Sequence, residues 1–149
     1  PVFDGERPIG STRDMRTWYT TRIAEPTQRC QVSHIVVDSG WEKYAANVVE
    51  AHAAVAAWVK NDHLGFHILY LWNGSKRKYI PDFLVRYQSG KTLVLEIKGV
   101  DSPQDQAKRE ALALWVQAVN EHGGFGIWVA DVVVGDAAGM QDVIHKHAA

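Results

Sequence analysis

The stretch from Tyr79 to Gly99 reads YIPDFLVRYQSGKTLVLEIKG, two apolar runs joined by a polar turn. Both runs are rich in Val, Leu, Ile and aromatic residues, which is typical of β-strands. The connection Gln88-Ser89-Gly90 suits a three-residue hairpin loop, because glycine readily takes the left-handed conformation needed at the last loop position. The stretch therefore predicts an antiparallel hairpin in which Tyr87 faces Lys91.

The length of this loop sets the register of the whole hairpin. With three loop residues, Asp82 lies opposite Glu96, and Lys98 lies opposite Ile80. Because side chains alternate between the faces of a strand, Asp82, Glu96 and Lys98 share one face. The other face, which we expect to be the dry core, carries Phe83, Val85, Leu93, Leu95 and Ile97. A two-residue loop would instead separate Asp82 from Glu96.

Three charged side chains inside apolar strands are costly unless they are paired or bind a cation. The facing carboxylates of Asp82 and Glu96 repel each other unless a cation lies between them, and oxygen ligands favour Mg²⁺ or Mn²⁺. Lys98, on the same face, can orient a water beside that metal. This pattern is typical of metal-assisted hydrolysis of a phosphate ester. The purely structural alternative, an ion pair between Asp82 and Lys98, does not account for the position of Glu96.

A third acidic residue is expected from the helix that precedes the hairpin. Asp38 and Ser39 are good N-cap residues, and apolar residues at helical spacing predict a long helix over 41–60. Its apolar arc is centred near Trp41, Val48, Val55 and Val59. The helical rotation places Glu42 on the flank of this arc and Glu50 almost opposite, in water. Glu42 also lies in the first turn, where the helix dipole favours an anion, so we expect Glu42 at the site; the alternative is an ordinary first-turn glutamate.

The remaining pattern predicts an α/β (α+β) fold in which a mixed sheet is flanked by helices. Residues 1–14 read as an N-terminal arm or linker, and residues 15–149 as one domain. Further strands are expected over 15–21, 32–37, 66–72, 78–87, 92–98 and 125–134, with further helices over 101–121 and 140–147.

Composition excludes several classes of protein. The 149 residues suit one domain, and 46% hydrophobic residues argue against a disordered chain. No apolar run approaches the roughly 20 residues needed to cross a membrane, and no signal peptide is recognisable. The single cysteine, Cys30, forms no internal disulfide, which favours a reducing, cytoplasmic location. A net charge of −1 argues against a protein that binds nucleic acid tightly without a partner.

Pro81-Asp82 followed by Glu96-x-Lys98, with an acidic residue on a preceding helix, resembles the PD-(D/E)XK nuclease superfamily. A wider set of segments resembles the C-terminal endonuclease domain of the type III restriction enzyme restriction subunit: Ser39-Gly40-Trp41-Glu42, Val59-Lys60-Asn61, Leu64-Gly65-Phe66, Tyr79-Ile80-Pro81-Asp82-Phe83 and Glu96-Ile97-Lys98-Gly99. Similar residues at Ser11-Thr12, Trp115 and Asn120 extend the resemblance over about residues 11 to 130. It implies a restriction-endonuclease-like core.

The resemblance also implies roles for individual residues. Asp82 and Glu96 would hold a divalent metal, Mg²⁺ or Mn²⁺, and the backbone carbonyl of Ile97 would join them. Lys98 would position the attacking water, and Glu42 would support a metal or a water. The substrate would be double-stranded DNA, whose phosphodiester bond is cut to leave a 5′-phosphate.

Partners follow from the same resemblance. In that family the domain follows an ATP-driven helicase motor in the same chain, and a methyltransferase subunit reads the target. This sequence has no phosphate-binding glycine loop, so we expect a fragment of a longer protein in which only the motor binds ATP. No membrane partner is expected.

Two groups of basic residues are candidate DNA contacts. Lys76-Arg77-Lys78 precedes the first catalytic strand, where the alternative is a solvated turn. Lys108 lies early in the second helix, where the alternative is an ordinary surface lysine; Asp105 and Gln106 are weaker candidates. Two other functions stay open: a nuclease of transposition, junction resolution or repair, and a catalytically inactive DNA-binding or assembly module. The intact Asp, Glu and Lys argue against the inactive module.

Overall fold

A mixed four-stranded sheet forms the centre of the chain in a computed structural model that describes residues 12–37, 39–134 and 138–149. In sheet order its strands are β3 (Val55–Lys60), β6 (Phe83–Tyr87), β7 (Thr92–Lys98) and β8 (Trp128–Val134). The pairs β3–β6 and β6–β7 are antiparallel, whereas β8 runs parallel to β7. The helix α2, between β7 and β8, makes the crossover that a parallel pair requires.

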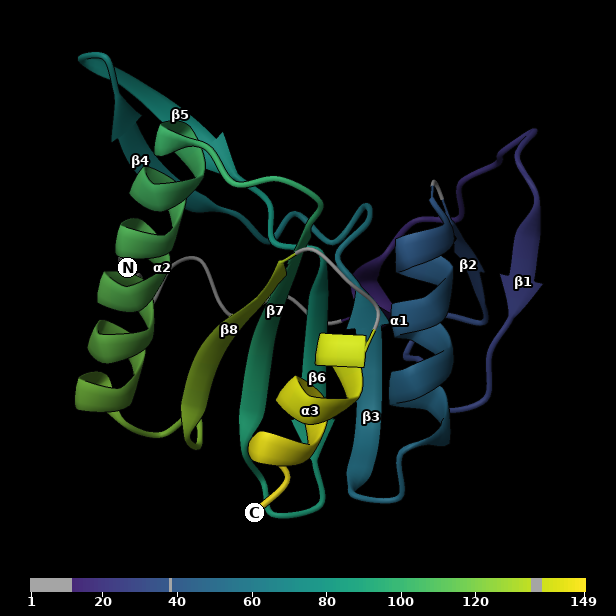
Figure 1. Cartoon of the computed structure of the whole chain (residues 1–149). Helices are drawn as coiled ribbons and strands as arrows, with labels where there is room; N and C mark the ends of the chain where they lie inside the picture. The colour runs from purple at the N-terminus through teal and green to yellow at the C-terminus, as the bar shows by residue number, and fades with distance from the viewer. Residues whose placement is uncertain (1–11, 38, 135–137) are drawn as a thin grey trace.

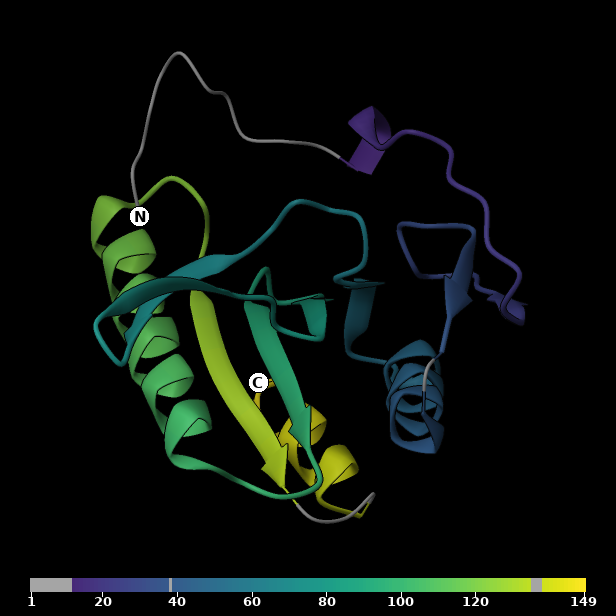
Figure 2. The same cartoon turned by 90° about the horizontal axis from the view of Figure 1, so that it is seen from above.

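Helices cover both faces of the sheet (Figure 1). In the described part of the chain they are α1 (Gly40–Ala51), α2 (Pro103–His122) and α3 (Ala138–Lys146). Two small sheets complete the fold: β1 (Ala24–Pro26) pairs with β2 (His34–Val36), and β4 (Ile68–Trp72) pairs with β5 (Ser75–Tyr79). Seen from above, the β4–β5 hairpin lies across α2, while β1 and β2 lie on the side of α1 (Figure 2). The predicted α/β fold with a mixed sheet is confirmed.

Each face of the sheet has its own apolar cluster. On the face of α1 and α3 the fully buried side chains include Ala45, Val49, Phe83, Val85, Leu93, Leu95, Met140 and Ile144. On the face of α2 the cluster is smaller and is shared with the β4–β5 hairpin; it includes Ile68, Tyr70, Tyr79, Val94 and Leu112. Apolar packing is therefore present on both faces, not only on the one predicted from the hairpin.

The predicted hairpin register is confirmed. Phe83 pairs with Leu95 and Arg86 with Thr92, and the amide of Tyr87 donates to the carbonyl of Lys91 (2.9 Å). Gly90 has a φ of 86°, the left-handed conformation that ends the loop. The register places Glu96 and Lys98 on one face, as predicted, and the structure shows that this face is the one covered by α2.

The predicted helix over 41–60 is wrong in its second half. The helix α1 ends at Ala51, and residues 55–60 form β3, which pairs with β6 along its length. The segment VAAWVK is rich in β-branched and aromatic residues, and its pairing with a central strand overrides the helix propensity of its alanines. Val55 and Val59 therefore belong to the sheet and not to the helix.

Three further differences concern strands. The predicted strand over 15–21 does not form, and β1 at Ala24–Pro26 is a strand that the sequence interpretation did not include. The predicted strand over 78–87 is divided at Ile80-Pro81-Asp82, because proline has no N–H for the ladder and β5 pairs with β4. Lys98 is consequently not opposite Ile80; it aligns with Val134 of β8.

Some expectations fall partly outside the described residues. Of the predicted arm over 1–14, residues 1–11 are not described, and Thr12–Asp14 form a short 3₁₀ turn. Asp38 is likewise not described, whereas Ser39 is the N-cap of α1. Within the described residues, no helix combines the length and apolar character needed to cross a bilayer.

Candidate functional site

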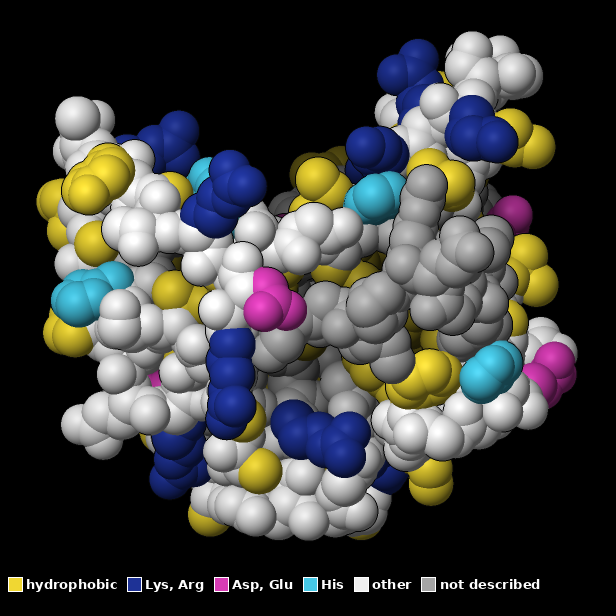
Figure 3. Space-filling model, turned by 180° about the vertical axis from the view of Figure 1, so that it is seen from behind, with side chains coloured by type: hydrophobic (Ala, Val, Ile, Leu, Met, Phe, Trp, Pro, Cys, Tyr) yellow, Lys and Arg dark blue, Asp and Glu magenta, His cyan; other side chains and the backbone are white. Residues whose placement is uncertain are grey.

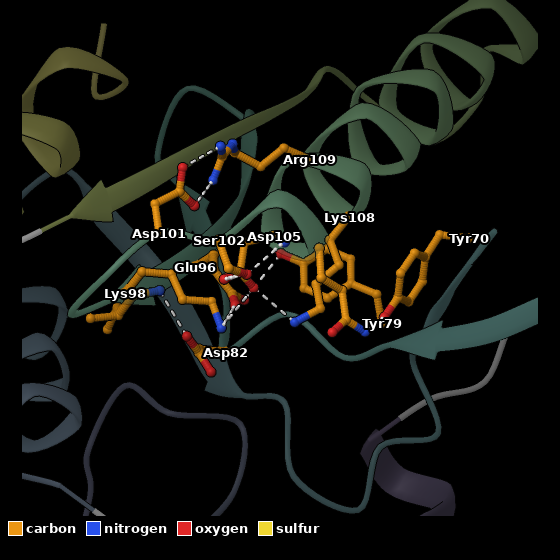
Figure 4. Close-up of polar contacts among 12 residues, drawn as sticks. Tyr70, Tyr79, Asp82, Glu96, Lys98, Asp101, Ser102, Asp105, Lys108 and Arg109 are labelled. Carbon is orange, nitrogen blue, oxygen red and sulfur yellow. Dashed lines mark hydrogen bonds and ion pairs between the residues drawn. The ribbon is translucent and has the colours of Figure 1, made fainter. Parts of the chain in front are cut away.

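Asp82, Glu96 and Lys98 meet at the end of the sheet where β7 leads into α2 (Figure 4). Glu96 and Lys98 lie at the end of β7, and Asp82 lies directly before β6. Asp82 Oδ2 accepts a hydrogen bond from the backbone N–H of Ile97 (2.7 Å), which ties the residue before β6 to the end of β7. The three residues predicted to form the centre are thus brought together.

Glu96 is buried, with 6% of its surface exposed, and both of its oxygens have partners. Lys98 Nζ lies 3.1 Å from Oε1, and the hydroxyl of Tyr79 donates to Oε2 (3.0 Å). Tyr79 is the last residue of β5, so the β4–β5 hairpin contributes directly to the site.

Asp105 is the site residue that the sequence interpretation undervalued. It is buried in the first turn of α2, and its Oδ1 lies 3.3 Å from Lys98 Nζ and 2.9 Å from Lys108 Nζ. Ser102, the N-cap, donates from Oγ to Asp105 Oδ2 (2.6 Å) and accepts from the Asp105 N–H (3.2 Å). The Ser-x-x-Asp spacing of a helix start was the available signal. Lys98 is consequently held between two carboxylates, those of Glu96 and Asp105.

The two facing carboxylates are short of positive charge. Burial and the charge of Glu96 raise the pKa of Asp82 to about 7, and the charge of Glu42 adds a smaller contribution. Burial also raises the pKa of Glu96, against the lowering effect of Lys98. Although burial acts in the opposite direction, Glu96 and Asp105 raise the pKa of Lys98, which stays a cation. One lysine shared with Asp105 therefore does not neutralise the pair.

Glu42 lies on the side of α1 that faces the site. Ser39 Oγ accepts from the Glu42 N–H (3.2 Å), and Glu42 Oε2 lies 3.0 Å from Lys60 Nζ. Lys60, at the end of β3, also donates to the carbonyl of Val36 (2.7 Å), and only 10% of its side chain is exposed. This buried lysine was missed, because β3 had been read as helix.

Glu50 does not face water as predicted. It accepts from the backbone N–H groups of Gln28 (2.8 Å) and Arg29 (2.9 Å) and from Trp58 Nε1 (2.5 Å). Although partial burial acts in the opposite direction, these hydrogen bonds lower the pKa of Glu50. The side chain joins α1 to the loop before β2 and to β3, away from the proposed centre.

Asn61 is a second residue that the sequence interpretation did not single out. Its Nδ2 donates to the carbonyls of Phe66 (3.0 Å) and Pro81 (2.8 Å), and its backbone N–H donates to the carbonyl of Asp82 (2.8 Å). This buried amide fixes the backbone on both sides of Asp82.

The candidate DNA-binding residues lie in two places. Lys76, Arg77 and Lys78 are exposed on β5, so the segment is a strand and not a turn, and its exposed side chains agree with the solvated alternative as well as with DNA contact. Lys108 points toward the site, where it pairs with Asp105 and lies 5.9 Å from the centre of the Tyr79 ring. The approach of Lys108 to the site is confirmed; contact with DNA stays a prediction for all four residues.

The donor chemistry at the site fits a hard divalent cation. Asp82, Glu96 and the carbonyl of Ile97 offer oxygen only, and Mg²⁺ is commonly held by one or two carboxylates with waters completing its shell. Within residues 12–37, 39–134 and 138–149, no group of three or more His, Cys, Asp or Glu side chains is arranged to hold a metal ion.

Comparison with known proteins gives no further guide. No family model matches the chain, and neither the search of curated proteins nor the search of solved structures found a significant match. The function therefore has to be argued from the residues that meet at this end of the sheet.

Proposed function

We propose that this chain is a metal-dependent DNA endonuclease domain with a restriction-endonuclease-like core. One observation carries the proposal: the carboxylates of Asp82 and Glu96 lie together at one end of the sheet, and the charge of Lys98 beside them neutralises the pair only in part. Their raised pKa values mark a place where a cation stabilises the ionised pair. The order of helix, hairpin and second helix also agrees with the core that the sequence resemblance implies.

Each residue has a defined part in this proposal. Asp82, Glu96 and the carbonyl of Ile97 would hold Mg²⁺ or Mn²⁺, which when bound supplies Lewis-acid stabilisation of charge on the phosphate. Lys98, a cation held by Glu96 and Asp105, orients the water that attacks phosphorus. Glu42, ordered by Lys60, supports a metal or a water from the opposite side.

The path proposed for DNA lies above this end of the sheet. The space-filling view from behind shows a hollow between two projecting parts of the molecule, and Lys and Arg side chains line both sides of it (Figure 3). The β4–β5 hairpin, which begins and ends beside the site, is one of these projections (Figures 1 and 3). A duplex resting there would place its backbone near Asp82 and Glu96.

The sequence resemblance extends the proposal to a biological system. We propose that the domain is the cleavage module of a type III restriction enzyme, acting with an ATP-driven helicase motor in the same full-length chain and a methyltransferase subunit. The net charge of −1 agrees with a domain that others bring to the DNA.

Nicking of supercoiled plasmid by the 149-residue chain tests the activity. Low salt and high protein concentration are needed, because few basic contacts give roughly micromolar affinity or weaker at physiological salt. We expect nicking that requires Mg²⁺ or Mn²⁺ and is abolished by Asp82→Ala or Glu96→Ala, whereas Asp101→Ala, an exposed carboxylate of the same region, retains it. Near wild-type nicking by either site variant would exclude this site. DNA binding without any nicking would favour an assembly module.

A further inference from the structure

The β4–β5 hairpin has two unlike faces. Its inner face packs on α2 through Ile68, Tyr70 and Tyr79, which are 3–6% exposed. Gln104 of α2 also donates to the hydroxyl of Tyr70 (2.6 Å), which fastens the hairpin to the helix. A two-stranded hairpin is marginal by itself, so this packing is what holds the arm in place.

The outer face combines leucines with lysines. The register pairs Leu69 with Lys78 and Leu71 with Lys76, so that these four side chains share the face opposite Tyr70 and Tyr79. Leu69 is 53% exposed and Leu71 is 69% exposed. Among the described residues, no carboxylate lies within ion-pair distance of Lys76 or Lys78.

Arg77 lies on the other side of the same strand. Alternation places it on the inner face, opposite Tyr70, although its side chain is exposed. The three consecutive basic residues are therefore not equivalent, and the hairpin supplies its own control.

The outer face is continuous with the proposed catalytic site. Lys78 directly precedes Tyr79, whose hydroxyl donates to Glu96. Seen from above, the hairpin crosses the top of the molecule over α2, with its outer face open (Figure 2). The outer face is thus one residue along the strand from the site, although the Tyr79 side chain that reaches Glu96 lies on the inner face.

We propose that this outer face enters the major groove of duplex DNA, with Lys76 and Lys78 on the phosphates and Leu69 and Leu71 against the groove. The proposal rests on the proposed function, since it takes DNA as the substrate of the adjacent site. The major groove admits a two-stranded β-ribbon, and its thymine methyl groups are natural contacts for apolar side chains. A polyanion also complements two lysines that have no acidic partner among the described residues.

Equilibrium titration of a fluorescent duplex by the whole chain, in EDTA and between about 20 and 100 mM salt, tests the proposal. In Lys76→Gln/Lys78→Gln the slope of log affinity against log salt should fall by about 2, because two phosphate contacts are lost. Leu69→Ser/Leu71→Ser should weaken binding about tenfold with the slope unchanged, because only apolar contact is lost. Arg77→Gln, whose side chain lies on the other face, should lower the slope by less than one lysine does, and Leu114→Ser, at an exposed leucine of α2, should bind like the wild type.

Two results would overturn the proposal: an Arg77→Gln effect as large as that of one lysine, or unchanged affinity in the leucine variant. Thermal melting should show all variants folded, because the substituted side chains are exposed. The titration contains no metal, so it does not depend on cleavage. If plasmid nicking fails while these binding effects hold, the endonuclease function is wrong and the DNA-binding arm stands.

Discussion

The two faces of the central sheet are built from the same strands, but one face is an apolar core and the other ends in charged residues. Toward α1 and α3, β6 and β7 present Phe83, Leu93 and Leu95, none of which has exposed surface. Toward α2, the same strand β7 ends in Glu96 and Lys98. A step of one residue along the chain thus changes a core contact into a charged site.

The comparison shows how such a site is tolerated. Buried carboxylates cost free energy when they lack a cation, and a closed apolar face on the other side of the sheet offsets that cost. The face of α1 and α3 should therefore govern stability, and the end of the α2 face should govern activity.

The largest expected effect is a difference in the free energy of unfolding between variants of two neighbouring residues, Asp82 and Phe83. Phe83→Ala should lower the free energy of unfolding by about 3–5 kcal/mol, because it empties a fully buried position. Asp82→Asn should leave metal-free stability unchanged or raise it, because a buried charge is removed while an oxygen can still accept from the Ile97 N–H. Urea unfolding in EDTA measures both. A loss in Asp82→Asn as large as that in Phe83→Ala would mean that this carboxylate is structural.

A second comparison lies within α1, between Glu50 and Glu42. Glu50→Gln should cost about 1–3 kcal/mol of stability, since Trp58 Nε1 and two backbone N–H groups lose a charged acceptor, but leave nicking by the folded protein unchanged. Glu42→Gln should slow nicking at least about tenfold at similar stability. Thermal melts and nicking rates of the two variants decide this. The reverse assignment would move the catalytic side of α1.

A third comparison uses two aspartates at the start of α2. Asp105→Asn should slow nicking about tenfold to a hundredfold, because Lys98 loses one of its two anchoring carboxylates. Asp105→Glu should recover part of the rate, which a merely structural role would not predict. Asp101→Asn, which breaks only the exposed pair with Arg109, is the matched control. Equal rates in the Asp105 and Asp101 variants would remove Asp105 from the mechanism.

The smallest expected effect concerns a carboxylate on the α3 side, that of Asp131 of β8. Its Oδ2 lies 2.8 Å from Lys146 Nζ and 2.7 Å from His147 Nε2, and although burial acts in the opposite direction, these partners lower its pKa. The ionised form is favoured in the fold, so its stabilisation is complete above the ordinary aspartate pKa of about 3.9 and is lost as pH falls through the lowered value. Asp131→Asn should therefore have a lower melting temperature than the wild type at about pH 5, where the wild-type carboxylate is ionised. The two melting temperatures should converge at about pH 2, where that carboxylate is protonated. A constant difference across that range would contradict the assignment.

The parts of the fold that the sequence predicts correctly are set by local geometry. One loop length and one glycine fix which residues of β6 and β7 face each other, so the positions of Glu96 and Lys98 follow directly. The N-cap at Ser39 is equally local, and it forms as expected.

The parts that it misses depend on tertiary pairing. Val55–Lys60 carries alanines that suit a helix, and only its place beside β6 makes it a strand. Because that strand was read as helix, Glu50 was placed in water and Lys60 was overlooked. Asp105 lies outside β7, so the strand alternation that predicts the position of Lys98 does not extend to it. Only the turn of the chain into α2 brings the two side chains together.

Asn61 holds together the two ends of the chain segment that contains β4 and β5. The backbone leaves the central sheet after this residue and returns at Pro81, and one amide group binds carbonyls on both sides of the excursion. The two ends of the hairpin insertion are therefore closed against each other independently of what lies between them. The position of Asp82 is therefore set by Asn61 and not by the length or surface of the segment between them, although Tyr79 at the end of that segment still donates to Glu96.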